Sequence, residues 1–207
     1  DFSFWKEFRD IAHKANKNTL LISEIFGDTS QWLQGDRFDG TMNYSFREAM
    51  TDFFATKRIN NKEFADSLAY LYSMYSFEAL SSCQNLLSSH DVKRFLNRCG
   101  NDEDGILGAI FLQATFPGIA GIYYGDEIGL GGADDPFNRE PFPWHNKESW
   151  NSTILEFTKK LMNIKKSNSI FKYGRFELLD ENEQFVAFRR ILKDESMLCI
   201  INRSKSN

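Results

Sequence analysis

The sequence predicts an alternating α/β fold followed by an antiparallel β meander, and three observations lead to this prediction. Up to about residue 166, short apolar runs alternate with segments whose apolar residues recur at helical spacing. Charged residues follow several of these runs, as they do at the carboxyl ends of parallel strands. Beyond a boundary near residues 167–173, apolar and polar residues alternate strictly, which is typical of antiparallel strands.

Each element follows from its local pattern. Residues 4–17 place Phe4, Phe8 and Ile11 on one helical face, whereas the next apolar run is too short and too rich in β-formers to be a helix. The remaining predicted elements are strands at 19–28, 38–44, 83–89 and 120–125, helices at 45–57, 62–79, 102–116 and 149–166, a loop at 126–146, and a meander of about three strands at 174–204.

Composition excludes several functional classes. With 25 Lys and Arg against 29 Asp and Glu, the chain has a net charge of −4 and no basic face for nucleic acid. No apolar run approaches the roughly 20 residues that span a bilayer. Cys83, Cys99 and Cys199 lack metal-ligand spacing and are expected as buried or free thiols, and nothing indicates a cofactor or a metal. No signal peptide is visible, but the chain opens with Asp1 and not Met, so the protein's N-terminus is expected to be absent and the cytoplasm is only slightly favoured over secretion.

Chemically capable residues follow three of the four predicted parallel strands. Glu24 ends the first, His90 and Asp91 follow the third, and Asp126 and Glu127 follow the fourth. Carboxylates on separate strand ends beside a histidine are suited to acid/base chemistry on a glycosidic bond. The alternative is that these are ordinary polar residues at strand ends.

The neighbours of the two carboxylates suggest different roles for them. Glu24 lies between Ile22 and Ile25, an apolar setting that favours the protonated form of an acid. Asp91, beside a potential donor, is expected to stay charged and to oppose a developing oxocarbenium ion. The 20 phenylalanines, seven tyrosines and four tryptophans mostly build a core, and the surplus suits a sugar-binding cleft, where ring faces match pyranose C–H faces.

Four segments together resemble the α-amylase family of glycoside hydrolases, in its cyclomaltodextrinase, neopullulanase and maltogenic-amylase branch. They are ISEIFGDTSQWLQGDRFDGTMNYSFREAM, LLSSHDVKRFL, ATFPGIAGIYYGDEIGLGG and DDPFNREPFPW. The resemblance covers nearly the whole chain. It implies the second half of a (β/α)8 TIM-type barrel at 1–168, with strands five to eight, and the first strands of an antiparallel β-sandwich domain at 169–207.

The resemblance also implies roles for single residues. Glu24 matches the general acid/base, Asp91 the carboxylate that stabilises the transition state, and His90 its sugar-contacting neighbour. Phe26 matches an aromatic residue near the leaving-group sugar. Asp135 and Arg139 match a pair that hydrogen-bonds the next sugar, with a loop salt bridge as the alternative. Tyr44 and Phe46 would line the cleft, with core packing the likelier role for at least one of them. The motif around Asp126 and Glu127 is taken as mainly structural.

The family's nucleophile is an aspartate in an Arg-x-Asp motif at the end of strand four. We expect no such motif within residues 1–207 and place the nucleophile shortly before Asp1, together with strands one to three and an inserted domain that often binds calcium. The pattern of strand ends alone would allow Asp91 as the nucleophile, but the resemblance implies otherwise.

The function implied is retaining hydrolysis of α-1,4 bonds in maltodextrins, cyclodextrins or related α-glucan oligosaccharides, by a protein of which this chain is a catalytically incomplete part. The alternatives are an α-1,6-acting or transglycosylating member of the family, or a non-catalytic glucan-binding or scaffolding relative. Because a half-barrel has unpaired strand edges, we also expect the isolated chain to self-associate.

Overall fold

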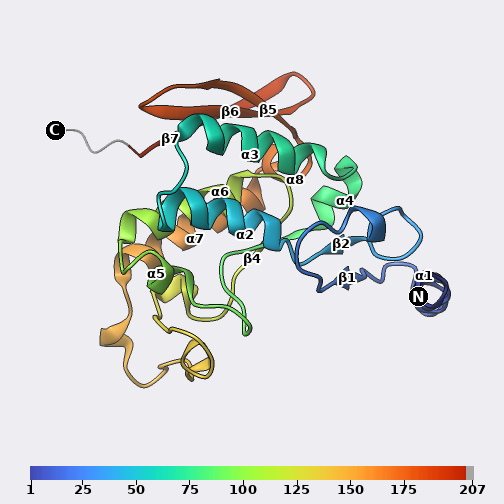
Figure 1. The fold of residues 1–207 in the computed structure, drawn as a ribbon, viewed down its shortest axis with the longest axis horizontal. Coiled ribbons are helices and arrows are strands. Elements are labelled where there is room, and N and C mark those ends of the chain that lie inside the picture. The colour runs from blue at the N-terminus through green and yellow to red at the C-terminus, as the bar shows by residue number, and fades with distance from the viewer. Residues whose placement is uncertain (204–207) are drawn as a thin grey trace.

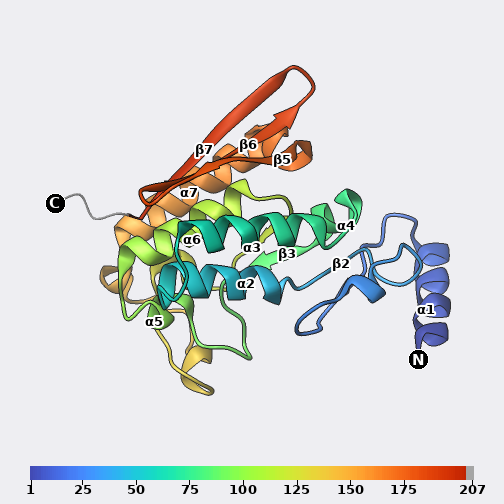
Figure 2. The same cartoon turned by 45° about the horizontal axis from the view of Figure 1, so that its top comes forward.

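The computed structural model describes residues 1–203 of the chain (Figure 1). Helix α1 (Phe2–Ala15) lies at one edge of the molecule, next to the first two strands, and a three-stranded antiparallel sheet lies against the helices (Figure 2). The short parallel strands lie between these two parts. Residues 204–207, the last residues of the predicted meander and domain, lie outside the described part.

The four predicted parallel strands are present but short. Strand β1 (Ile22–Ser23) pairs in parallel with β2 (Gly40–Thr41), and β3 (Gln84–Leu86) pairs in parallel with β4 (Ile119–Gly121). A parallel bridge between Met42 and Gln84 links the two pairs, so the strands lie in chain order. The predicted run of 19–28 was too long because it turns away after Ser23 and reaches Gly27 in a left-handed conformation, φ 79°.

Five of the helices after α1 begin where an Asn or Asp side chain caps their free amide groups. In each case an Asn or Asp side chain accepts a hydrogen bond from the first turn. The helices and their caps are α2 (Tyr44–Met50) after Asn43, α3 (Asn61–Ser73) after Asn60, α6 (Glu103–Thr115) after Asp102, α7 (Ser152–Ser167) after Asn151 and α8 (Ser169–Tyr173) after Asn168.

Two helical predictions needed correction, and two short helices were missed. The helix expected at 62–79 is broken, because the Ser76 hydroxyl caps a new helix, α4 (Phe77–Ser82). The helix expected at 45–57 ends as α2 at Met50 and continues as a π-helical turn over 51–55. The short helices α5 (Phe95–Arg98) and α8 were not predicted at all. The loop of 126–146 holds two 3-10 turns, at Asp126–Ile128 and Phe137–Arg139, and a third follows at Lys147–Ser149.

The predicted meander is confirmed. Strands β5 (Arg175–Glu181), β6 (Phe185–Leu192) and β7 (Glu195–Asn202) form an antiparallel sheet that packs on α3 and α8. A continuous series of ring contacts joins this sheet to the helices through Phe46, Phe116, Phe176 and Phe188. The sheet and the helical part therefore share one aromatic core.

Two expectations from composition can be compared with the structure. Cys83, Cys99 and Cys199 are free and buried, as expected, and burial raises the pKa of these thiols to about 11, 12 and 11. Within residues 1–203, no helix combines the length and apolar character that a bilayer crossing needs.

Helix α1 contacts the molecule through one side. Trp5 packs on Phe38 at 5.0 Å between ring centroids, and Arg9 Nη2 lies 2.8 Å from Asp39 Oδ1. None of its residues is buried, and Phe4, Phe8 and Ile11 remain exposed. With β1 the helix borders an apolar groove of about 580 Å³ that extends to Glu24. We refer to it as the α1–β1 groove.

Candidate functional site

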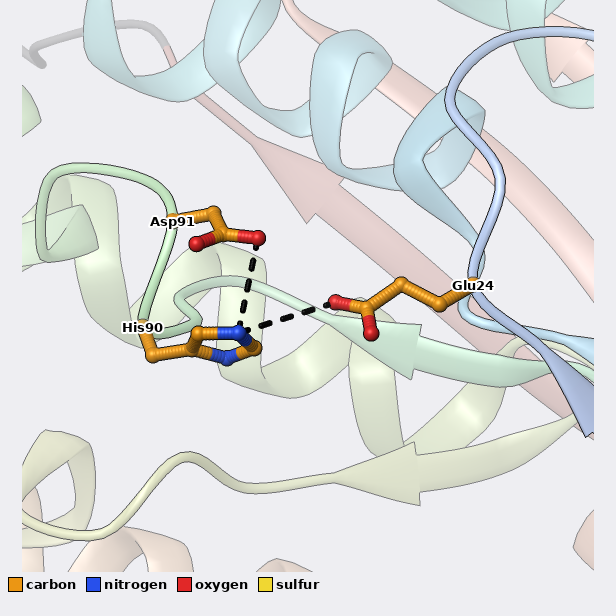
Figure 3. A group of neighbouring side chains, drawn as sticks. All are labelled: Glu24, His90 and Asp91. Carbon is orange, nitrogen blue, oxygen red and sulfur yellow. Dashed lines mark ion pairs between the residues drawn. The ribbon is translucent and has the colours of Figure 1, made fainter.

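Glu24, His90 and Asp91 meet at the carboxyl ends of the parallel strands. Glu24 directly follows β1, and the other two lie on a turn four residues beyond β3. His90 Nε2 lies 4.0 Å from Glu24 Oε1 and 3.4 Å from Asp91 Oδ2. Figure 3 shows both carboxylates directed at the imidazole from two separate segments. Residues that follow parallel strands were expected to gather at one edge of the sheet, and here Glu24 and His90 do so although they are 66 positions apart in the sequence.

All three side chains are open to solvent. The exposed fractions are 43% for Glu24, 48% for His90 and 43% for Asp91. The expected apolar enclosure of Glu24 is therefore wrong for this chain, because Ile22 and Ile25 are only half-buried and leave the carboxylate uncovered. A ligand that contacts these three groups can reach them without moving the backbone.

The same three groups are the one cluster within residues 1–203 that offers three close donors of the kind that bind metals. One donor atom from each lies within 4.8 Å of the others. Exposed acidic groups are common without an ion, and carboxylates and an imidazole also form hydrogen bonds with hydroxyl groups.

Tyr44 and Phe26 form a stacked pair beside the cluster. Their ring centroids are 4.0 Å apart at an interplanar angle of 23°. Phe26 is 57% exposed, whereas Tyr44 is buried and its hydroxyl lies 3.1 Å from Ser89 Oγ. Burial, with the nearby charges of Glu24 and Asp91, raises the pKa of Tyr44. The free ring face therefore belongs to Phe26, while Tyr44 supports it from below. Phe46 is fully buried and belongs to the core.

Asp135 and Arg139 reach the cluster from the loop after β4. Arg139 Nε lies 2.8 Å from Asp135 Oδ1 and donates to the carbonyl of His90 at 3.0 Å. Its Nη2 lies 3.6 Å from Asp91 Oδ1. The loop salt bridge that the sequence allowed is present, and it stands next to the three clustered residues.

Asp126 and Glu127 have structural partners. The Asp126 carboxylate is buried and lies 3.3 Å from Nη1 of the fully buried Arg94. Burial raises the pKa of Asp126 to about 7, against the opposing effects of Ser88 and Arg94. Glu127 Oε2 accepts a hydrogen bond from the backbone of Gly125.

Two residues of this region were not singled out from the sequence. Arg94 stacks over the rings of Tyr123 and Tyr124, at 4.7 and 4.9 Å, and donates to the Tyr124 carbonyl. Asn138, which is 1% exposed, donates to backbone carbonyls of the turn that contains His90. Both belong to the quoted segments, but no pattern separates them from their polar neighbours.

The expectation that residues 1–207 contain no Arg-x-Asp motif was wrong, because Arg37-Phe38-Asp39 has this pattern. The structure places Asp39 before β2, at the amino ends of the strands, where it accepts a hydrogen bond from Leu21 N and pairs with Arg9. Burial would raise its pKa, but the bonds from Arg9 and Leu21 and the charge of Arg9 outweigh burial and lower it. Since Glu24 and Asp91 lie at the opposite ends of the strands, Asp39 fixes α1 and takes no part in the site.

Comparison with known proteins shows a consistent set of similarities. A family model described as the alpha amylase catalytic domain matches residues 1–173. The chain is 38% identical to neopullulanase 2 of Thermoactinomyces vulgaris over 98% of its own length and 35% of that protein. It is 36% identical to a cyclomaltodextrinase of Thermoanaerobacter pseudethanolicus, over 99% of its length and 35% of that protein. The chain thus spans about a third of the length of these relatives.

Solved structures agree with the sequence similarities. The cyclic α-maltosyl-(1→6)-maltose hydrolase of Arthrobacter globiformis superposes with a TM-score of 0.95 at 31% identity, over 99% of this chain and 46% of that one. Structures of the same hydrolase contain its cyclic substrate or maltose, with TM-scores of 0.95 and 0.92.

Proposed function

The chain belongs to the α-amylase family of glycoside hydrolases, and from that premise we propose that it provides the acid/base side of an active site for α-glucosidic bonds. The observation that supports this most is the convergence of Glu24, His90 and Asp91 at the carboxyl ends of two parallel strands. The substrates are maltodextrins, cyclodextrins or related oligosaccharides with α-1,4 bonds, cleaved with retention of configuration.

In this proposal Glu24 performs two proton transfers. It first protonates the departing glycosidic oxygen while a nucleophilic carboxylate attacks the anomeric carbon and forms a glucosyl ester. The resulting Glu24 carboxylate then accepts a proton from water, which cleaves the ester and releases the sugar. Its exposed side chain allows both the leaving sugar and the water to reach it.

The other residues contact the sugars. Asp91 opposes the positive charge of the oxocarbenium-like transition state and His90 hydrogen-bonds the same sugar. Arg139 and Asp135 hold the next sugar toward the non-reducing end. Phe26 presents its exposed ring to the sugar that leaves.

The nucleophile is the part of the mechanism that geometry alone would assign differently. Retaining glycosidases place their two carboxyl groups about 5–5.5 Å apart, and the donor atoms of Glu24 and Asp91 lie within 4.8 Å of each other. We nevertheless assign the nucleophile to an aspartate outside residues 1–207, because the family resemblance makes Asp91 the stabilising carboxylate. The chain alone is then expected not to hydrolyse α-glucans.

We further propose that residues 1–168 form strands five to eight of a (β/α)8 barrel and that 169–207 begin a C-terminal β-sandwich. The parallel strands in chain order support the first assignment. The second is supported by the end of the family match at residue 173, directly before β5. In this arrangement the α1–β1 groove borders the outer edge of strand five, and the isolated chain would self-associate through it.

A second candidate function is cleavage of α-1,6 bonds. The similar hydrolase of Arthrobacter globiformis has a 1→6 linkage in its name. The two candidates differ in an assay with pullulan and cyclodextrin as competing substrates. Preference for the 1→6 bonds of pullulan would select the second candidate.

The experiment that tests the acid/base assignment is Glu24→Gln in the longer protein that includes residues 1–207 and the proposed nucleophile. Maltodextrin and cyclodextrin hydrolysis should fall by orders of magnitude, because an amide cannot protonate the leaving oxygen. Glu78→Gln, near Asp39 at the amino ends of the strands, is the matched control and should keep its rate. Wild-type rates in Glu24→Gln would exclude Glu24 as the acid, and an inactive wild-type protein that still binds glucans would favour the non-catalytic relative.

A further inference from the structure

The turn that contains His90 and Asp91 is built around a single buried amide. The side-chain nitrogen of Asn138 lies 2.9 Å from the carbonyl oxygen of His90, 3.0 Å from that of Val92 and 3.4 Å from that of Ser89. Asn138 is 1% exposed, so water does not compete for these bonds.

The orientation of this amide follows from its surroundings. The amide nitrogen has two hydrogens, which it donates to the carbonyls of His90 and Val92. The longer contact with the carbonyl of Ser89 must share one of these hydrogens and is weak. With the amide rotated by half a turn, its oxygen would face three carbonyl oxygens. The nitrogen must therefore point into the turn, and the Asn138 oxygen is left without a partner in the described structure.

We propose that Asn138 is a positioning residue that fixes the backbone of the His90–Asp91 turn, an inference that rests on the proposed function of that turn. Asn138 contacts no reacting group itself. It acts through the carbonyls on both sides of Asp91, so it sets the direction in which the Asp91 carboxylate leaves the turn.

Other bonds to the turn are weaker constraints. Arg139 Nε also donates to the His90 carbonyl, but the Arg139 side chain is 46% exposed and shares its charge with Asp135 and Asp91. The Asp91 amide donates to Ser89 Oγ at 3.2 Å, which is a bond within the turn itself. Removal of Asn138 would leave the Val92 carbonyl without the donor that the structure shows for it and the His90 carbonyl with the exposed Arg139 alone, a loss that these bonds do not replace.

The same loop also contains the pair proposed to hold the next sugar. Asn138 and Arg139 are adjacent, and both donate to the carbonyl of His90. The distance between the sugar held by Arg139 and the sugar opposite Asp91 is therefore set through one backbone oxygen. Since a displacement of about 1 Å can cost about 100-fold in rate, the loss of Asn138 is expected to appear in kcat.

The test compares Asn138→Ala with Asn61→Ala in the longer active protein. Asn61 is a matched control, because it is also buried and its side-chain nitrogen also donates to a turn carbonyl, that of Asn182 between β5 and β6. Both variants should lower the melting temperature. Only Asn138→Ala should lower kcat, by roughly 10- to 100-fold with a smaller change in KM, at temperatures where both proteins are folded.

Amide hydrogen exchange of residues 89–92 provides a second readout that needs no activity. Exchange in this segment should be faster in Asn138→Ala than in the wild type and unchanged in Asn61→Ala. The milder Asn138→Ser, which retains one short donor, serves if the alanine variant does not fold. Unchanged kcat and unchanged exchange in a folded variant would overturn the inference. If the wild type shows no α-glucan hydrolysis, the proposed function fails instead, and hydrogen exchange alone decides the role of Asn138.

Discussion

The two sides of the candidate site are held in different ways. The turn with His90 and Asp91 is bound from several elements, by Asn138 after β4, by Arg47 of α2, which donates to the carbonyl of Leu87, and by the Arg94–Asp126 pair beneath it. Glu24 follows β1, which has a partner strand on one side only within the described residues, and it borders the α1–β1 groove. The chain thus builds the Asp91 side from its own contacts, while the Glu24 side adjoins an apolar surface.

This difference has a consequence for the acid. Beyond Glu24 the segment is held by the stack of Phe26 on Tyr44 and by a bond of 3.3 Å from Ser45 Oγ to the carbonyl of Gly27. A strand or another chain that covered the groove would remove water from one face of Glu24. The protonated form that a general acid needs would then be favoured.

The largest expected effect concerns the groove. The isolated chain should self-associate, because exposed Phe8 and the free edge of β1 bury apolar surface when a second copy covers them. Phe8→Ser should shift light-scattering masses toward the monomer, whereas Tyr173→Ser, at a more exposed aromatic position on α8, should not. A wild-type monomer at high concentration would contradict this prediction.

A smaller effect is expected on the Asp91 side of the site, at Arg139. Arg139→Ala should weaken oligosaccharide binding by roughly 1–3 kcal/mol, the scale of a charge-assisted hydrogen bond lost from a polar site. Calorimetric titration with maltotriose measures the change. Stability should barely alter, because the ion pairs of Arg139 are solvent-exposed. Arg58→Ala, which removes another exposed ion pair, is the control, and a lower melting temperature with unchanged affinity would support a salt bridge alone.

The last expected effect is a pH dependence of stability at the Arg94–Asp126 pair. Burial raises the pKa of Asp126 from 3.8 to about 7, so between these values the folded state retains a proton that the unfolded state has lost. The free energy of unfolding should therefore decrease as the pH rises from about 4 to about 7 and change no further above it. Urea unfolding at pH 5 and pH 8 should show a larger decrease for the wild type than for Asp126→Asn. Equal decreases would show that Asp126 does not titrate in this range.

Much of the fold and part of the site were predictable from the sequence. Periodicity located the parallel strands and the meander. Positions at the carboxyl ends of parallel strands predicted that Glu24 lies near His90 and Asp91. The break in the predicted helix at 62–79 was missed because one capping hydroxyl, that of Ser76, outweighs a continuing apolar pattern. Asn138 was missed for a related reason. Its partners are backbone carbonyls 46 to 49 positions away, and backbone atoms leave no signature in sequence.

The exposure of Glu24 could not be predicted from its neighbours. Ile22 and Ile25 are apolar, but a side chain is enclosed by the elements that pack over it, and on this side the described residues provide only the rim of the α1–β1 groove. Burial is a property of tertiary packing, and short apolar flanks do not determine it.

The division of roles between Asp91 and an aspartate outside residues 1–207 is the central claim, and covalent trapping tests it most directly. A fluorinated glucosyl fluoride forms the glucosyl ester and slows its hydrolysis, so that peptide mass spectrometry of the longer protein identifies the esterified carboxylate. We predict a label on an aspartate that lies before Asp1 in the longer protein and none on Asp91. A label on Asp91 would contradict the account and would make the pair of Glu24 and Asp91 the complete catalytic machinery.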